Sequence, residues 1–139
     1  MRPESSTRRD PLYLVDIIRS ARSIATFLQD VDEDQWLRDE QLQSAVQWKI
    51  MNIGEAANGL SEVIRDSRPE IPWRQIRGLR NILAHAYFSV DLGAIWITSR
   101  TFVPILEKHA LALLWLVDPD VAKQFEHLGP NRADDLLPE

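Results

Sequence analysis

The sequence contains no cysteine, only five glycines among its 139 residues, and no long apolar run. Without cysteine the chain can form neither a disulfide framework nor a thiolate zinc site, which fits a reducing compartment. The longest unbroken apolar run, residues 110–117, is far shorter than the ~20 residues of a membrane-spanning helix. Residues 1–10 are polar and do not read as a signal peptide. We therefore expect a soluble, cytoplasmic protein with no membrane partner.

Basic residues are the minority, since 16 Lys and Arg against 21 Asp and Glu give a formal charge of −5. This balance argues against a protein that coats nucleic acid non-specifically, because such binding needs a basic surface. The charge is uneven, however. Residues 65–80 hold five arginines and two acids, whereas residues 30–40 hold six acids and one arginine. A local basic patch on an acidic body can still bind a phosphate chain at one place.

Hydrophobic residues make up 45% of the chain and charged residues 27%, as in a globular domain. Apolar residues recur at spacings of three and four, and no segment alternates with the two-residue period of a strand. We predict an all-α, antiparallel up-and-down bundle of four main helices plus short helices. A single domain is expected over residues 10–130, with a flexible segment 1–9 before it and a loose tail 131–139 after it.

Two of the main helices are predicted in the first half of the chain. Asp10, followed by a proline, reads as the N-cap of a helix over residues 10–28. The longest periodic segment predicts one helix of nearly seven turns over residues 41–65. Gly54 and Gly59 interrupt it, and because glycine weakens a helix they indicate that another backbone comes close there.

Shorter signals organise the rest of the chain. The acid-rich segment before residue 41 predicts a helical turn anchored by Trp36 and Leu37. A long helix is predicted over residues 91–117, capped by an aspartate at its start and bent at Pro104. A further aspartate followed by proline starts a short helix over residues 118–129.

The remaining helix, over residues 72–88 (PWRQIRGLRNILAHAYF), concentrates the polar side chains. Helical geometry places Arg77, Asn81 and His85 on one stripe, each ~40° from the last. Arg80 precedes His85 by five residues and lies ~140° around the same helix. The two could meet if the helix end unwinds, if the long arginine side chain reaches round, or if a second protomer completes the site.

An arginine and a histidine together suit phosphodiester cleavage. A guanidinium clamps a phosphate and stabilises charge on its oxygens. An imidazole can take a proton from a ribose 2′-hydroxyl or give one to the leaving oxygen. Asn81 could orient the histidine or bind a phosphate oxygen. This chemistry needs no metal or cofactor, and the three histidines do not have the spacing of metal ligands. By spacing alone, a surface arginine and a hydrogen-bonded core histidine are the better explanation of the pair.

The wider string decides between these interpretations. An arginine, four intervening residues, a histidine, any residue and a tyrosine occur here as Arg80, His85 and Tyr87, with Asn81 directly after the arginine. Together with IPWR, GLRNILAHAYF, VDL and the upstream IGEAA, this pattern resembles the HepT-like toxins of the HEPN superfamily. The resemblance covers roughly residues 10–106.

The resemblance implies a toxin of a type II toxin–antitoxin system, a small helical ribonuclease that works without metal. It implies a homodimer whose active site lies where the two motif helices meet, with Arg80 and His85 as catalytic residues and RNA, such as a transfer or messenger RNA, as substrate. It also implies a cognate minimal nucleotidyltransferase antitoxin. In some members this partner transfers AMP to the motif tyrosine, here Tyr87, which would block the cleft and repel RNA phosphate.

Several other residues have both a structural and a functional interpretation. Glu55 lies at the edge of an apolar stripe, where a buried carboxylate would pair with an arginine of the 72–88 helix; a direct catalytic role is the alternative. Arg74 and Arg77 either follow the RNA or face solvent. His109 is expected to pack in the core and His127 to favour a helix end. The five tryptophans are expected in the core or in a dimer interface.

Two alternative functions remain open. The same fold could be a non-catalytic HEPN module that binds a nucleotide or docks a nucleotidyltransferase, in which case the polar cluster is a docking surface. It could also be a structural helical bundle without a site. Cleavage of RNA by the purified protein separates the ribonuclease from both.

Overall fold

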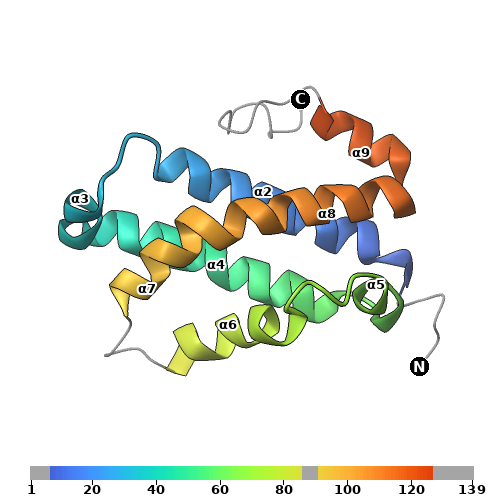
Figure 1. The fold of residues 1–139 in the computed structure, drawn as a ribbon, viewed down its shortest axis with the longest axis horizontal. Coiled ribbons are helices and arrows are strands. Elements are labelled where there is room, and N and C mark those ends of the chain that lie inside the picture. The colour runs from blue at the N-terminus through green and yellow to red at the C-terminus, as the bar shows by residue number, and fades with distance from the viewer. Residues whose placement is uncertain (1–6, 86–90, 127–139) are drawn as a thin grey trace.

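The computed structural model describes residues 7–85 and 91–126, and for residues 80–85 and 126 it describes the backbone but not the side chains. Helices joined by short turns make up the described chain, with no strand among these residues (Figure 1). The predicted all-α bundle is therefore confirmed. No helix in the described ranges has both the length and the apolar character needed to cross a bilayer.

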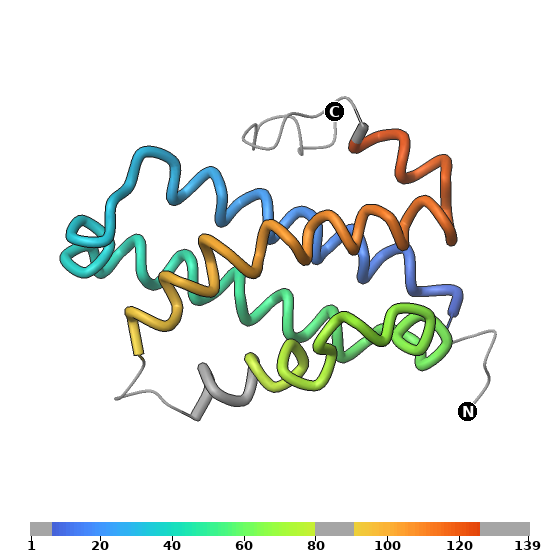
Figure 2. The backbone as a smooth tube through the Cα atoms, in the orientation of Figure 1, coloured from blue at the N-terminus to red at the C-terminus, as the bar shows by residue number. Residues whose placement is uncertain are grey.

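Four main helices alternate in direction along the chain and form an up-and-down bundle (Figure 2). α2 packs on both α4 and α8, and α6 packs on the free side of α4. The elements are α2 (Asp10–Phe27), α3 (Glu33–Arg38), α4 (Glu40–Gly59), α5 (Glu62–Ser67), α6 (Trp73–His85), α7 (Leu92–Ile97), the π-helical segment η1 (Thr98–Phe102), α8 (Val103–Val117) and α9 (Pro119–Glu126).

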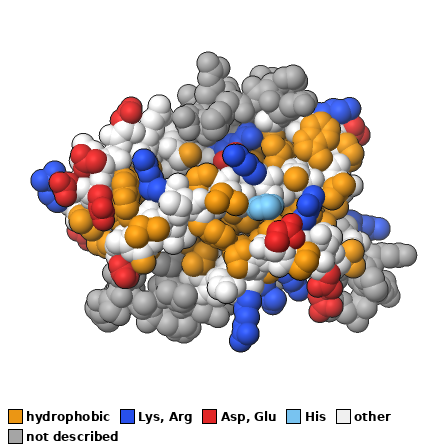
Figure 3. All heavy atoms as spheres, in the orientation of Figure 1, with side chains coloured by type: hydrophobic (Ala, Val, Ile, Leu, Met, Phe, Trp, Pro, Cys, Tyr) orange, Lys and Arg blue, Asp and Glu red, His pale blue; other side chains and the backbone are white. Residues whose placement is uncertain are grey.

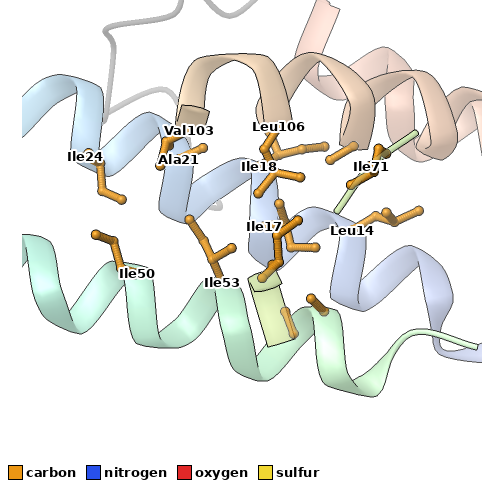
Figure 4. Close-up of a cluster of buried hydrophobic side chains, with 14 of the residues drawn as sticks. Leu14, Ile17, Ile18, Ala21, Ile24, Ile50, Ile53, Ile71, Val103 and Leu106 are labelled. Atoms are coloured by element: carbon orange, nitrogen blue, oxygen red, sulfur yellow. The ribbon is translucent and has the colours of Figure 1, made fainter. Parts of the chain in front are cut away.

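The core lies where α2, α4 and α8 meet, with apolar side chains pointing inward from all three (Figure 4). These side chains recur three or four residues apart on each helix, so each helix presents one continuous apolar face. Burial of these faces provides the main stabilisation of the bundle. Its most buried members include Leu14, Ile17, Ile18, Ile24, Val46, Ile53, Leu106 and Leu113.

Asp10 is not the N-cap of α2, contrary to the sequence-based prediction. Arg9 occupies that position without a side-chain cap, and Asp10 lies in the first turn of the helix. Its carboxylate is instead buried and accepts two hydrogen bonds from Ser61. The pairing with a residue distant in sequence therefore replaces the local cap.

The predicted helix over residues 41–65 is broken into α4 and α5. α4 ends at Gly59, Leu60 adopts an extended conformation, and Ser61 caps α5 by accepting a hydrogen bond from the backbone nitrogen of Ile64 at 3.3 Å. The ring of Tyr13, rather than another backbone, lies against Gly59, because a Cβ there would be 2.5 Å from the tyrosine Cζ.

The remaining helix predictions are mostly confirmed. Trp36 is fully buried and donates a hydrogen bond to the carbonyl of Leu92 at 2.8 Å, but Leu37 is exposed and is not an anchor. The long helix starts at its predicted aspartate cap and is interrupted by η1 just before Pro104. The predicted stop of the last helix at residue 129 lies outside the described residues.

Candidate active site

α6 carries the candidate motif and is fixed to the bundle by its first turn. The indole nitrogen of Trp73 donates to the carbonyl oxygens of Arg65 and Arg68, each at 3.1 Å. Ile71, just before α6, and Ile76 within it are also buried. These contacts fix the first turn of α6 to the end of α5, and α6 also packs on α4.

Of the predicted polar stripe on α6, only the Arg77 side chain lies within the described part of the chain. Arg74 and Arg77 are both exposed, and Arg77 Nε donates a hydrogen bond to the Asn58 side-chain oxygen on α4 at 3.1 Å. No described residue forms a hydrogen bond or ion pair with the Arg74 side chain. Of the two arginines, one is tied to the neighbouring helix and the other extends into solvent.

Arg80, Asn81 and His85 lie on the backbone of α6, but their side chains lie outside the description, and Tyr87 lies outside the described residues. The convergence of Arg80 and His85 therefore stays a prediction. The backbone nevertheless bears on it, because α6 remains helical through His85. The helix is therefore not unwound between Arg80 and His85.

Glu55 is exposed on α4, so the expectation that this carboxylate is buried is wrong. It lines an open pocket of about 350 Å³ between α2 and α4, together with Tyr13, Arg19 and Lys49. In the same pocket, partial loss of hydration raises the pKa of Asp16, and the nearby Arg19 opposes this shift. The pocket mixes both signs of charge.

Sequence reasoning missed two residues beside the stripe, Asn58 and Arg65. Asn58 precedes Arg77 by nineteen residues, and no local pattern indicates that they would meet. Burial lowers the pKa of Arg65 and the positive charge of Arg77 lowers it further. The only available signal was the surplus of arginine in residues 65–80.

The other sequence candidates divide between core and surface. His109 is half-buried on α8 and not fully packed, and His127 lies outside the described residues. Trp36 and Trp73 are buried, but Trp48 on α4 is exposed and is not a core residue. The described residues contain no group of three His, Asp or Glu side chains placed to hold a metal ion. Both signs of charge are visible across one face of the molecule (Figure 3).

Most of the chain is similar to a known protein family. Residues 17–113 match the family model described as HepT-like, ribonuclease HepT-like. A Methanocaldococcus jannaschii protein named "Putative RNase" is 33% identical over 103 residues, covering 74% of this chain and 94% of that protein. The "Probable ribonuclease HepT" of Thermococcus cleftensis is 35% identical over 95 residues, covering 68% of this chain and 86% of the relative.

A third relative is longer. The M. jannaschii protein named "Gamma-glutamylcyclotransferase and putative RNase" is 34% identical over 107 residues, which cover 77% of this chain but 48% of that protein. The chain thus spans nearly the whole of one of these three relatives, most of another and about half of the third. No solved structure matches it.

Proposed function

Because this chain belongs to the HepT-like ribonuclease family, we propose that it is the toxin of a type II toxin–antitoxin system and cleaves RNA without a metal ion. Arg80 and His85 are the proposed catalytic residues, and Asn81, Arg77 and Arg74 hold the substrate. The observation that supports the proposal is the exposure of Arg74 and Arg77 on α6. Because Arg74 and Arg77 are exposed, a phosphate chain can reach α6 from solvent.

The proposed reaction is an internal transesterification. The ribose 2′ oxygen attacks phosphorus, the bond from phosphorus to the 5′ oxygen breaks, and the products are a 2′,3′-cyclic phosphate and a free 5′-hydroxyl. His85 takes the 2′-hydroxyl proton or gives one to the leaving oxygen. Arg80 stabilises the negative charge that builds on the phosphate oxygens. Asn81 orients the histidine or binds one of those oxygens.

The cleavage test uses purified protein, shown by mass to carry no AMP, incubated with transfer and messenger RNA in EDTA. We expect cyclic-phosphate products from the unsubstituted protein and none from Arg80→Ala or His85→Ala. Arg38→Ala, in an exposed arginine on α3 and outside the motif helix, is the matched control and should stay active. Cleavage that survives both motif substitutions, or that requires added Mg²⁺, contradicts the proposal.

A homodimer is proposed to complete the site, because the regular helix keeps Arg80 and His85 ~140° apart on one chain. If one protomer supplies the arginine and the other the histidine, two inactive variants complement each other. A mixture of Arg80→Ala and His85→Ala should recover about a quarter of full activity, since half of the random dimers are mixed and each has one intact site of two. No recovery after subunit exchange contradicts the shared site.

Neutralisation is proposed to come from a cognate nucleotidyltransferase that modifies Tyr87. The tyrosine oxygen attacks the α-phosphorus of ATP, pyrophosphate leaves and the phenolic proton is lost to solvent. The attached AMP adds bulk and negative charge beside Arg80 and His85, which repels RNA phosphate. Glu55, on the neighbouring helix, is proposed to pair with an arginine of α6. Co-expression with the antitoxin should add the mass of AMP to the protein but not to Tyr87→Phe.

A further inference from the structure

Two arginines from different helices are anchored on the last turn of α4. Arg77 of α6 donates from Nε to the Asn58 side-chain oxygen at 3.1 Å. Arg65 of α5 donates from Nη1 to the carbonyl oxygen of Leu60. Asn58 and Leu60 are two residues apart, so the end of α4 brings the guanidinium groups of α5 and α6 to one place.

The two guanidinium groups are close enough to affect each other. Burial lowers the pKa of Arg65 and the charge of Arg77 lowers it further, whereas Glu62, Asp66 and Asp10 act in the opposite direction. Among the described residues, no carboxylate lies within 4.0 Å of Arg65 or Arg77. The repulsion between the two arginines is therefore not relieved by a direct ion pair in this part of the chain.

We propose that Arg65, Arg77 and Asn58 form a second phosphate-binding subsite, for an RNA phosphate other than the one that is cleaved. A phosphate between two guanidinium groups accepts charge-assisted hydrogen bonds from both and offsets their repulsion. Asn58 occupies only the Nε proton of Arg77, which leaves the terminal N–H groups for a ligand.

The position of the subsite fits a neighbouring phosphate of the same strand. Arg77 lies three residues before Arg80, ~4.5 Å along the helix axis. The subsite rests on the proposed ribonuclease function, because it needs a phosphate chain bound along α6. The subsite accounts for Arg65, which the catalytic motif does not include, and for Asn58, which fixes Arg77.

A purely structural role offers the competing explanation. The end of a helix carries partial negative charge, and an arginine that donates to its last carbonyls stabilises it. That role explains the bond from Arg65 to Leu60 and concerns only stability. Glutamine separates the two roles, because its amide can still donate to the carbonyl while its charge is absent.

The experiment measures binding of a fluorescent single-stranded RNA by anisotropy at several salt concentrations. His85→Ala serves as the parent protein so that the RNA stays intact. Arg65→Gln and Arg77→Gln are added singly to this parent, and Arg38→Gln on α3 is the matched control. Each subsite substitution should reduce the slope of log affinity against log salt by about 0.7. The control should leave the slope unchanged, and urea denaturation of each variant monitors stability.

The outcomes distinguish this subsite from the proposed function. An unchanged slope in both subsite variants, with His85-dependent cleavage intact in the unsubstituted protein, overturns the subsite alone. An unchanged slope in Arg65→Gln, whether or not its stability changes, assigns that residue to the helix end and also overturns the subsite. If the unsubstituted protein cleaves no RNA, the proposed function falls and the subsite falls with it.

Discussion

Both carboxylate oxygens of Asp10 accept hydrogen bonds from Ser61, one from the backbone nitrogen at 2.8 Å and one from the hydroxyl at 2.6 Å. Asp10 is only 1% exposed, and Ser61 is the cap of α5. The pair therefore fixes the start of α2 to the break between α4 and α5. From there the chain leads through α5 into the motif helix.

We expect Asp10→Asn to lower the free energy of unfolding by about 1–3 kcal/mol, because an amide cannot accept both hydrogen bonds and would leave a buried polar group unsatisfied. Urea denaturation measures the change. Asp39→Asn is the matched control, since Asp39 caps α4 from an exposed position and asparagine caps about equally well. An equal loss in the two variants would contradict the importance of the buried pair.

The contact between Tyr13 and Gly59 predicts that substitutions at these two positions have strongly non-additive effects on stability. In Gly59→Ala the new Cβ would meet the tyrosine ring at 2.5 Å, so we expect a loss of about 1–3 kcal/mol from overpacking. In a Tyr13→Ala background the same substitution should cost nothing or stabilise, because alanine is the better helix former. Urea denaturation of the four proteins gives the coupling energy. Additive effects would exclude the clash.

The buried ion pair between Arg22 and Glu107 gives a third prediction. Their side chains are 4% and 17% exposed, with Arg22 Nε 3.3 Å from the glutamate oxygen. Glu107→Gln leaves a buried cation without its counter-charge, and we expect a loss of about 3 kcal/mol in urea denaturation. Glu70→Gln is the control, since its pair with Arg68 is largely exposed, and should change stability by less than about 1 kcal/mol. Similar losses in Glu107→Gln and Glu70→Gln would contradict the expected difference between a buried and an exposed ion pair.

Much of the fold could be predicted from sequence because its signals are local. Spacings of three and four indicate the faces of α2, α4 and α8, and Asp91 and Asp118 accept hydrogen bonds from nitrogens three residues ahead. Each such signal depends on neighbouring residues within one turn of helix. The four-helix architecture follows once those faces are paired.

The features that the sequence did not predict all depend on contacts between residues that are distant in the chain. The break at Leu60 follows from Ser61, whose conformation is held by Asp10, 51 residues earlier. The hydrogen bond from Arg77 to Asn58 likewise joins two helices. Neither partner stands out in its own segment. The candidate site was found through a motif string, whereas the residues that support it are brought in by tertiary packing alone.

Asp16 predicts a pH dependence of stability. Partial burial raises its pKa above the usual value of 3.8, so the native state favours the protonated form. The stability from protonation is fully present below 3.8 and is lost as pH rises through the raised pKa. Asp16→Asn should therefore be more stable than the unsubstituted protein at pH 7, and the difference should vanish in acid. Urea denaturation across pH checks this, and a difference that is constant with pH would contradict it.

Gly78 lies on the site face of α6, ~40° from Arg74 and ~20° from His85 around the helix axis. No described atom lies within 4 Å of the place a Cβ would occupy. In the monomer, Gly78→Ala should therefore raise the free energy of unfolding by about 0.5–1 kcal/mol, because glycine is the weaker helix former.

The same methyl group would lie ~20° from the histidine position around the helix axis, on the face where the RNA or the second protomer is proposed to approach. We therefore expect Gly78→Ala to be more stable in urea but to cleave RNA with a lower kcat/KM than the unsubstituted protein. Gly93→Ala in α7 is the matched control, since its Cβ would make an ordinary contact of 3.4 Å with Asp91, and it should leave cleavage unchanged. If Gly78→Ala gains stability and keeps full activity, neither RNA nor a partner comes close to this face of α6, and the active site must lie elsewhere.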